Sequence, residues 1–509
     1  MTRPGQDRRL VALVACTIVG AVALRTAWMA DEAFLTFRVA DNFVHGFGLR
    51  WNVAERVQVF THPAWLALVS AFYAITHEAY FTVLAVSIAF TIAVMYLLVT
   101  RLAVDTPSAV GAAAVLVLSK AFVDYTTSGF ETPLTYALIA GFWALYFGGS
   151  HARAVRLWLP LAAALLVLTD AAAAALVIPA LAVAIWRTRA QGVWRPIVIA
   201  LAPILVWEAF AFFYYGALLP NPTIARLYAG LSTAERTRHG IVYLLDSINL
   251  DPLTLTVVGA AIALALAGTA RGTRALAVGL VLYLLLVIRM GGDAMTGRLL
   301  APALLCAAVV VSRVDTDALT PAMRVQALSA IVGLELMSPR PITHVRRYPD
   351  SPQRYVSDVT GIVDARHLSS LGTALVNLRR NVPWPTEDGV PGGRTPRESE
   401  PRVVVSDRPG LQGFFGGPSL HLIHTGAATD PVLARLPAKP ASQVGVERRP
   451  IPDGYVKVLA GAPASFTDPT VALLYGRAVA ATRDPIWSWR RFRRLVQINF
   501  GRGGPEVPR

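Results

Sequence analysis

The chain alternates between long apolar runs and short polar stretches over its first two thirds. Residues 1–28 combine a basic start with an apolar middle and lack a small-residue cleavage site, which predicts an uncleaved anchor that begins in the cytoplasm. Further apolar runs occupy 63–79, 81–100, 107–122, 134–148, 157–169, 171–186, 196–213, 252–268, 275–289, 299–312 and 324–337. Because ~20 apolar residues in a helix cross a bilayer, the pattern predicts a mostly α-helical polytopic membrane protein with about 11 transmembrane helices.

Segment 63–79 is the exception among these runs. It begins with Pro63 and contains His77 and Glu78. Counting it as a crossing gives an odd number of spans between two loops that are expected on the same side of the membrane. It is therefore either a full span, a re-entrant segment or a helix on the membrane surface.

The apolar pattern ends near Ser338, and no later run is long enough to span a membrane. We therefore expect a transmembrane domain over residues 1–337 and a soluble α/β domain over residues 338–509. In the second domain the sequence predicts a strand at 402–406 and helical stretches near 430–436 and 469–480. A Pro- and Gly-rich loop is expected at 381–400.

Basic clusters next to apolar runs predict the orientation of the chain in the membrane. The clusters at 151–156, 187–195 and 271–274 are expected in the cytoplasm. Polar motifs then collect on the exoplasmic side, and by parity the C-terminal domain lies there too. These motifs are the loop at 30–62, the stretch 125–133, Asp170, the stretch 214–226 and the stretch 290–298.

Composition and charge agree with a membrane protein. Of the 509 residues, 54% are hydrophobic and only 16% are charged, whereas soluble chains carry about a quarter charged residues. The net charge of +15 does not indicate nucleic acid, because the arginines flank the apolar runs. Cys16 and Cys306 lie inside apolar segments and form no disulfide or zinc pattern. His45 and His62 have no ligand spacing around them, and we expect no obligatory metal.

The pair Asp31 and Glu32 directly follows the first apolar segment and begins the external loop at 30–62. Acids at this position either mark the boundary with water or act in catalysis. A carboxylate that is partly desolvated at such a boundary gains basicity, so Asp31 is our candidate for a general base. Arg38 and His62, which belong to the same loop region, are candidates for binding substrate.

Arginines on the exoplasmic side are candidates for binding a phosphate, because the guanidinium presents paired donors. Arg298, in the stretch GGDAMTGR, is the first choice, followed by Arg226 and Arg289. Glycines in the same stretch allow backbone N–H groups to approach an anion. The alternative is an ordinary loop with an interfacial arginine.

Four further polar residues are candidates for binding the sugar or the acceptor. Glu131 either binds a hydroxyl or lies at a helix start, where its charge favours the helix dipole. Asp293 either binds sugar hydroxyls or pairs with Arg298. Asn221 is a hydrogen-bonding candidate that turn chemistry explains equally well, and Asp170 lies alone between two apolar runs.

Several stretches together resemble a known family. The sequence ADEAFLTFRVADNFVHGFGLRWNVAERVQVFTHPAW is similar to the first external loop of bacterial GT-C glycosyltransferases, and more narrowly of the terminal β-1,2 arabinofuranosyltransferases of the mycobacterial cell wall. Further matches follow in the family's order: TSGFETPL, YYGALLPNPTIAR, GGDAMTGRLLAP, TGIVDAR, TDPVLARLPA, ERRPIPDGYV and DPIWSWRRFRRL.

The resemblance implies a multi-pass enzyme of the bacterial plasma membrane with an exoplasmic active site. It implies a polyprenyl-phosphate sugar as donor, with decaprenyl-phosphate arabinofuranose the best single choice, and a glycan or glycoconjugate as acceptor. The catalytic carboxylate maps onto Asp31, which then has to share a pocket with Arg298. The chain departs from the family at Glu32, where relatives commonly carry Asp, and at LTDAAA, which keeps only Asp170 of a longer motif.

Three alternatives stay open from the sequence. The sugar is mannose or another hexose, or the chain is a transporter or flippase for a lipid-linked sugar, or it is an inactive relative that serves as a scaffold.

Overall fold

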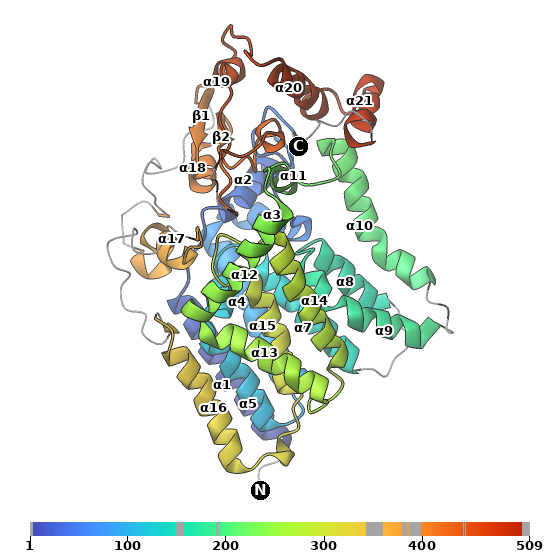
Figure 1. The fold of residues 1–509 in the computed structure, drawn as a ribbon, viewed down its shortest axis with the longest axis vertical. Helices are drawn as coiled ribbons and strands as arrows, with labels where there is room; N and C mark the ends of the chain where they lie inside the picture. The colour runs from blue at the N-terminus through green and yellow to red at the C-terminus, as the bar shows by residue number, and fades with distance from the viewer. Residues whose placement is uncertain are drawn as a thin grey trace. The chain divides into compact units, whose positions relative to one another are not determined.

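The computed structural model describes residues 4–148, 157–189, 192, 194–339, 341–342, 360–378, 384–385, 399–440, 442 and 444–500. The predicted basic cluster at 151–156 and most of the predicted loop at 381–400 lie outside these residues. Helices make up most of the described chain, and its one sheet has two strands (Figure 1).

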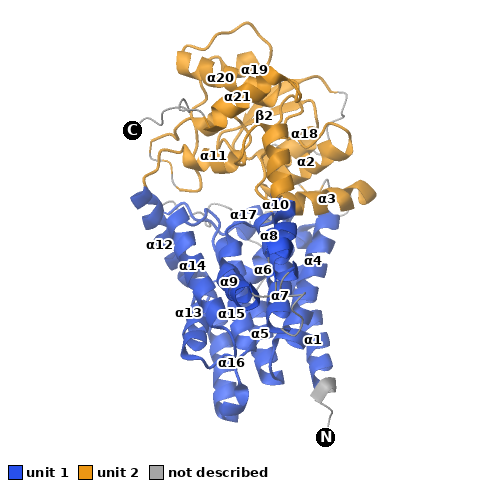
Figure 2. Ribbon diagram, turned by 90° about the vertical axis from the view of Figure 1, so that its right-hand side faces the viewer, with its two compact units in different colours: residues 1–29, 80–204, 233–378 blue, residues 30–79, 205–232, 379–509 orange. Residues whose placement is uncertain are grey.

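The chain divides into two compact units (Figure 2). Unit 1 comprises Met1–Met29, Tyr80–Ile204 and Thr233–Leu378, and unit 2 comprises Ala30–Ala79, Leu205–Ser232 and Arg379–Arg509. This division differs from the boundary expected between residues 337 and 338. Residues 30–62, the predicted external loop, belong with the C-terminal part because the two share hydrogen bonds, such as those between Asn52 and the backbone of Leu422.

Unit 1 is a bundle of helices around α15. Every residue of α15 except Val311 is buried, and α15 packs against α5, α7 and α13. The helices of this unit are α1 (Pro4–Arg25), α4 (Tyr80–Leu97), α5 (Thr106–Leu118), α6 (Lys120–Thr126), α7 (Thr132–Gly148), α8 (Leu159–Val167), α9 (Ile178–Thr188), α12 (Thr233–Leu250), α13 (Pro252–Ala267), α14 (Arg274–Met290), α15 (Ala301–Ser312), α16 (Pro321–Leu336) and α17 (Ala365–Thr373). Helix α10 (Trp194–Tyr215) belongs to both units.

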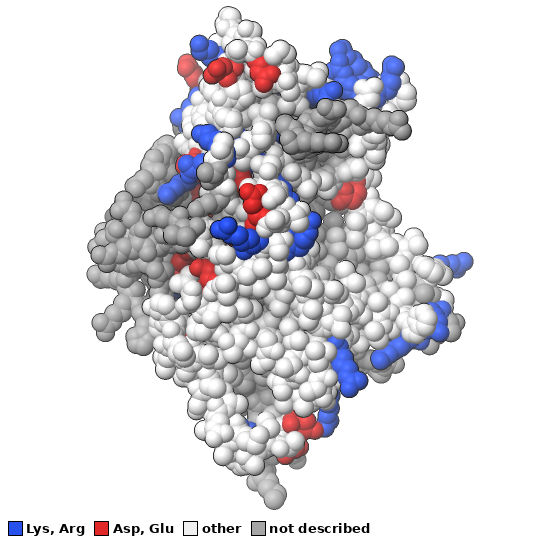
Figure 3. Space-filling view, in the orientation of Figure 1, with Lys and Arg blue, Asp and Glu red and all other residues white. Residues whose placement is uncertain are grey.

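Each apolar run predicted from the sequence falls on a helix, although 171–186 includes a 3₁₀ turn at Ala173–Leu176 before α9. Among the described residues, two helical segments are long and apolar enough to cross a membrane, namely Tyr80–Leu102 and Trp194–Tyr215. In the face shown in Figure 3, the helices of unit 1 carry few charged side chains along their middle. These features are those of a helical membrane protein.

Two more pairs of helices pass the same test together but are bent. Helices α5 and α6 meet at 67°, and α12 and α13 meet at 112°. The first bend lies at Ser119, whose backbone is extended and whose hydroxyl accepts the N–H of Phe122. The second lies at Asp251, which caps α13 immediately before Pro252. Both breaks therefore have local causes in the sequence.

Unit 2 contains a parallel pair of strands, β1 (Arg402–Ser406) and β2 (Leu420–His424), in which Arg402 lies opposite Leu420. The strand expected at 402–406 and the helix expected near 469–480 are confirmed, whereas 430–436 contains a short 3₁₀ helix, η10 (Leu433–Arg435). The helices of this unit are α2 (Ala33–Val44), α3 (Pro63–Thr76), α11 (Asn221–Leu227), α18 (Pro409–Gly416), α19 (Tyr455–Leu459), α20 (Pro469–Thr482) and α21 (Trp489–Phe500).

A close approach inside unit 1 predicts a strong effect of one substitution. A Cβ on Gly279 of α14 would lie 2.4 Å from the carbonyl oxygen of Leu176, whereas a Cβ on Gly259 of α13 would meet nothing within 4 Å. We expect Gly279→Val to cost about 1–3 kcal/mol in stability and to lower the melting temperature of the protein in detergent micelles. Gly259→Val is the matched control, and equal losses in both variants would contradict this packing.

Candidate functional site

A cluster of charged side chains surrounds Arg298 in unit 1. Nη1 of Arg298 lies 3.1 Å from Oδ2 of Asp293, and Nη2 lies 3.7 Å from Oε1 of Glu131. The guanidinium also lies over the ring of Phe130, 4.1 Å from the ring centroid. Asp170 interacts electrostatically with both Glu131 and Arg298. Four residues chosen from the sequence as candidates therefore lie together.

The loop that carries Asp293 and Arg298 is fixed by three tyrosine hydroxyls. Tyr125 donates to the carbonyl of Thr296 at 2.9 Å, and Tyr283 donates to the carbonyl of Leu299 at 2.7 Å. The hydroxyl of Tyr243 donates to the carbonyl of Met295 and accepts the N–H of Leu299 at 3.0 Å. The site is therefore preorganised by groups on three helices.

A glycine is required where this loop meets Tyr243. Gly292 has a φ of +66°, and a Cβ there would lie 2.6 Å from the Tyr243 side chain. Only glycine adopts this conformation in so little space. The glycines that the sequence singled out thus shape the loop around Arg298.

Three carboxylates face one guanidinium in this cluster. When all four groups are ionised the local charge is negative, which favours a hydroxyl-rich ligand over an isolated anion. The guanidinium of Arg298 contacts both Asp293 and Glu131, one with each terminal nitrogen. Arg289, exposed in the last turn of α14, contacts the hydroxyl of Thr233 at 3.5 Å.

A second network in unit 1 was not predicted. Lys120 on α6 forms ion pairs with Asp124 and, at 3.2 Å, with Asp364, and Arg366 pairs with Asp124. Burial by itself raises the pKa of Asp364, but Lys120, His367 and Arg366 hold that pKa well below its ordinary value. The side chains of Lys120, Asp124, Asp364 and Arg366 are all buried.

Two signals in the sequence pointed to this network. Lys120 interrupts the apolar run 107–122, and charged residues in such runs commonly have a function or a partner. Asp364 and Arg366 belong to the stretch TGIVDAR, which served only as part of the resemblance. Nothing local in either segment indicated that Lys120 and Asp364, which are 244 residues apart, would meet.

Asp31, the candidate base, lies in unit 2 and holds the start of helix α18. Its carboxylate accepts the N–H groups of Gly410 at 2.8 Å and Leu411 at 2.7 Å, which belong to the first turn of that helix. Burial raises the pKa of Asp31, and the two N–H donors act in the opposite direction. Asp31 thus occupies the place of a capping side chain although it is 379 residues away from Gly410. Glu32 is exposed.

The other candidates in unit 2 have partners within the protein. Arg38 is buried, donates to the carbonyls of Gly417 and Leu420, and stacks on Trp51. Its burial lowers its pKa to about 9, although Asp41 opposes this shift. His62 Nε2 lies 2.8 Å from Oγ1 of Thr36.

Asn221 uses its side-chain N–H groups to hold the loop before η10. It donates to the carbonyls of Ala427, Ala428 and Asp430 at 2.9–3.1 Å. Asn221 therefore positions this loop, and its side-chain N–H groups are used within the protein. Arg226 lies in the last turn of α11 and is partly exposed.

No family model, no curated protein and no solved structure matches the chain. Within the described residues, no three His, Cys, Asp or Glu side chains form a group suited to a metal ion.

The contact between Asp31 and α18 predicts a local loss of order when the carboxylate is removed. Asp31→Ala leaves two N–H groups of the first turn without their acceptor, at a cost of about 1–2 kcal/mol. We expect faster hydrogen exchange at residues 410–416, measured by mass spectrometry. Glu32→Ala removes an adjacent exposed acid and should leave that exchange unchanged. Similar exchange in both variants would argue against the contact.

The buried network predicts a larger loss when one partner is removed. Lys120→Met removes the cation that Asp124 and Asp364 share, so Asp124 keeps its pair with Arg366 and Asp364 its contact with His367, at a cost of about 3–5 kcal/mol. The double variant Lys120→Met/Asp364→Leu removes one of these charges as well and should recover part of the loss. Thermal unfolding in detergent measures both. A double variant that is less stable than the single one would contradict the coupling.

Proposed function

We propose that the chain is a glycosyltransferase of the GT-C type that moves a sugar from a polyprenyl-phosphate carrier to a hydroxyl of an exoplasmic glycan. The sugar proposed is arabinofuranose and the carrier is decaprenyl phosphate, with mannose or another hexose as the alternative. The enzyme would cross the bacterial plasma membrane about 11 times and carry its active site and C-terminal domain on the exoplasmic side.

The observation that carries the proposal is the cluster of Glu131, Asp170, Asp293 and Arg298. These side chains come from three separate stretches of the chain, and they meet in a unit built of apolar helices. Charged groups in such surroundings are costly and are commonly retained for function. The carboxylates suit sugar hydroxyls, and the guanidinium suits a phosphate oxygen.

In the proposed reaction, the acceptor hydroxyl oxygen attacks the anomeric carbon of the donor sugar. The bond from that carbon to the phosphate oxygen breaks, and the bonding electrons leave with the polyprenyl phosphate. Asp31 takes the hydroxyl proton, and Arg298 offsets the negative charge on the leaving phosphate. Arg226 is the second candidate for neutralising this phosphate.

The two hydrogen bonds that Asp31 accepts are compatible with a role as base. Each carboxylate oxygen has a second lone pair after accepting one N–H group. The N–H donors also favour the ionised form, which a base has to adopt before it receives a proton. Glu32, which is exposed beside it, would assist by contacting the acceptor.

A transporter or flippase for a lipid-linked sugar is the second candidate function. The two bent helix pairs, α5 with α6 and α12 with α13, favour it, because broken helices form the substrate sites of many transporters. The buried network around Lys120, on α6 just after the first break, points in the same direction.

An assay in proteoliposomes separates the two functions. Purified protein is given a panel of synthetic polyprenyl-phosphate sugars and a glycan acceptor. We expect new glycosidic bonds with wild type, a loss of at least about a hundredfold in Asp31→Asn, and a loss of about tenfold or more in Arg298→Gln. Lys439→Gln, an exposed charge change in unit 2, should keep full activity.

The outcomes of this assay decide between the candidates. Equal transfer by wild type and Asp31→Asn would remove Asp31 from the mechanism. Turnover only with hexose carriers would replace arabinofuranose by that hexose. Movement of intact lipid-linked sugar across the bilayer without a new bond would establish the transporter.

A further inference from the structure

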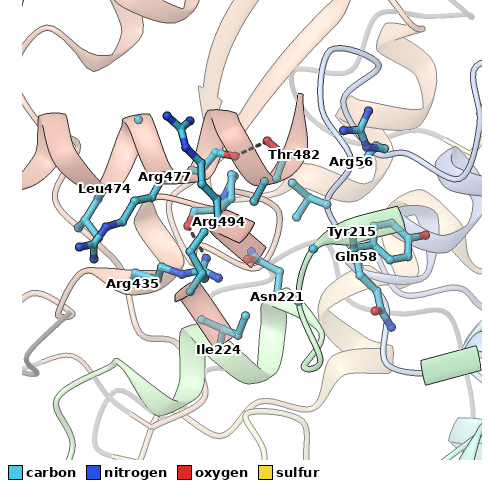
Figure 4. A pocket seen from close by; sticks show the side chains of 18 of the residues that line it. Arg56, Gln58, Tyr215, Asn221, Ile224, Arg435, Leu474, Arg477, Thr482 and Arg494 are labelled. Atoms are coloured by element: carbon cyan, nitrogen blue, oxygen red, sulfur yellow. Dashed lines mark hydrogen bonds between the residues drawn. The ribbon is translucent and has the colours of Figure 1, made fainter. Parts of the chain in front are cut away.

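Unit 2 contains a cavity of about 720 Å³ (Figure 4). The end of α10 and the loop after it form one side, and residues 56–58, α11, η10, α20 and α21 form the rest of the wall. A volume of this size falls within the range of small-molecule sites, about 300–1,000 Å³. None of the residues around Arg298 or Asp31 lines it.

The cavity is strongly basic. Arg56, Arg435, Arg477 and Arg494 line it, and no Asp or Glu does. In Figure 4, Arg435, Arg477 and Arg494 gather on one side of the cavity and Arg56 lies on the other. Four guanidinium groups without a carboxylate in the lining make this a site for an anion.

The hydrogen bonds of two of these arginines leave their charge available. Arg56 donates to the carbonyls of Tyr214 and Asp484, and Arg435 donates to the carbonyl of Pro431 at 2.7 Å. A carbonyl oxygen is neutral, so these bonds orient the guanidinium groups without cancelling them. The carboxylates of Asp484 and Asp430 act on Arg56 and Arg435 by charge but do not line the cavity.

The cavity also borders a helix that is suited to a membrane. Tyr215, the last residue of α10, lines it, and α10 is long and apolar enough to cross a bilayer. Only 11% of the apolar window of α10 is buried inside the protein. A helix so exposed along its apolar length is best accommodated by lipid.

Aromatic rings at the end of α10 and along α21 form a second feature typical of a membrane surface. The ring of Phe213 packs against Phe492 and near Trp487, and Phe212 lies near Phe500. Trp487 is 90% exposed, and Phe500 is 67% exposed. Exposed Trp beside the end of an apolar helix is characteristic of the membrane–water boundary.

Helix α21 is joined to α20 and to the end of α10 by one buried arginine. Arg491 is buried and donates to the carbonyls of Ala481, Phe213 and Tyr214, which joins α21 to α20 and to the end of α10. The charged side chains Arg490 and Arg493 are exposed on the same helix. Basic residues and aromatic rings on one amphipathic helix favour a surface that carries anionic lipid.

We propose that the arginine-lined cavity binds the phosphate-bearing headgroup of an anionic membrane lipid, with α21 lying in the membrane surface beside it. The guanidinium groups contact the phosphate oxygens, and apolar lining residues such as Leu219, Leu473 and Ile498 contact the first carbons of the lipid. Bound lipid would fix the end of α10 against α20 and α21. This site does not depend on the proposed transferase activity.

The test measures lipid binding to the full-length protein in detergent micelles by native mass spectrometry. Phosphatidylglycerol and phosphatidylcholine, which differ in headgroup charge, are titrated separately. We expect saturable binding of one phosphatidylglycerol, and a loss of affinity of about tenfold or more in Arg435→Gln/Arg494→Gln. Ala472→Trp, which fills the cavity from an exposed position and keeps every charge, should cause a similar loss.

The matched control is Lys439→Gln/Lys457→Gln, which removes the same charge from exposed positions of unit 2 outside both the cavity lining and α21. We expect its affinity to stay within about twofold of wild type. An equal loss of affinity in this control would show that general surface charge, and not the cavity, binds the lipid. Equal binding of phosphatidylcholine would show that the lipid does not need a net negative charge. Displacement of lipid by equimolar inorganic phosphate would assign the site to free phosphate, and displacement by an acidic polysaccharide would assign it to a glycan.

Discussion

The cost of burying charge is the constraint on which both units of this protein depend. In unit 1 the buried Lys120 meets the opposite charges of Asp124 and Asp364, as the buried Glu55 of unit 2 meets Arg483. In unit 2 the buried arginines Arg38 and Arg491 donate to backbone carbonyls instead. Both solutions provide partners for buried donors, each of which would otherwise cost several kcal/mol in free energy, although Nε and Nη1 of Arg38 have no hydrogen-bond acceptor among the described residues. They differ in the net charge that remains, because a carboxylate neutralises a buried cation whereas a backbone carbonyl leaves its charge in place.

The same difference in remaining charge distinguishes two sites, one in each unit. The cluster around Arg298 has more carboxylates than guanidinium groups, so it suits a ligand that is rich in hydroxyls. The cavity beside Tyr215 has four arginines and no acid in its lining, so it suits an anion. The net charge of +15 therefore does not describe a uniform surface. The same chain contains one site that is rich in carboxylates and another that is rich in arginines.

The helices were predictable from the sequence, whereas their grouping was not. An apolar run predicts a helix from its own residues, and α4, α10 and α14 lie where such runs occur. Strand β1 was predicted, but its partner β2 was not, because LHLIH is short and alternates polar and apolar residues only weakly. The grouping of residues 30–79 with the C-terminal part rests on hydrogen bonds between distant segments, which no local pattern encodes.

The same limit applies to the candidate site. Composition and position identified Glu131, Asp170, Asp293 and Arg298, and the structure brings them together in unit 1. The position of Asp31 after the first apolar segment indicated a carboxylate at a boundary, but not that Gly410 and Leu411 would donate to it. These bonds connect the anchoring of α18 with the role as base that we propose for Asp31. The two donors that anchor α18 favour the ionised carboxylate and oppose the effect of burial, which raises the pKa of Asp31, and the ionised form is the one that the proposed base requires.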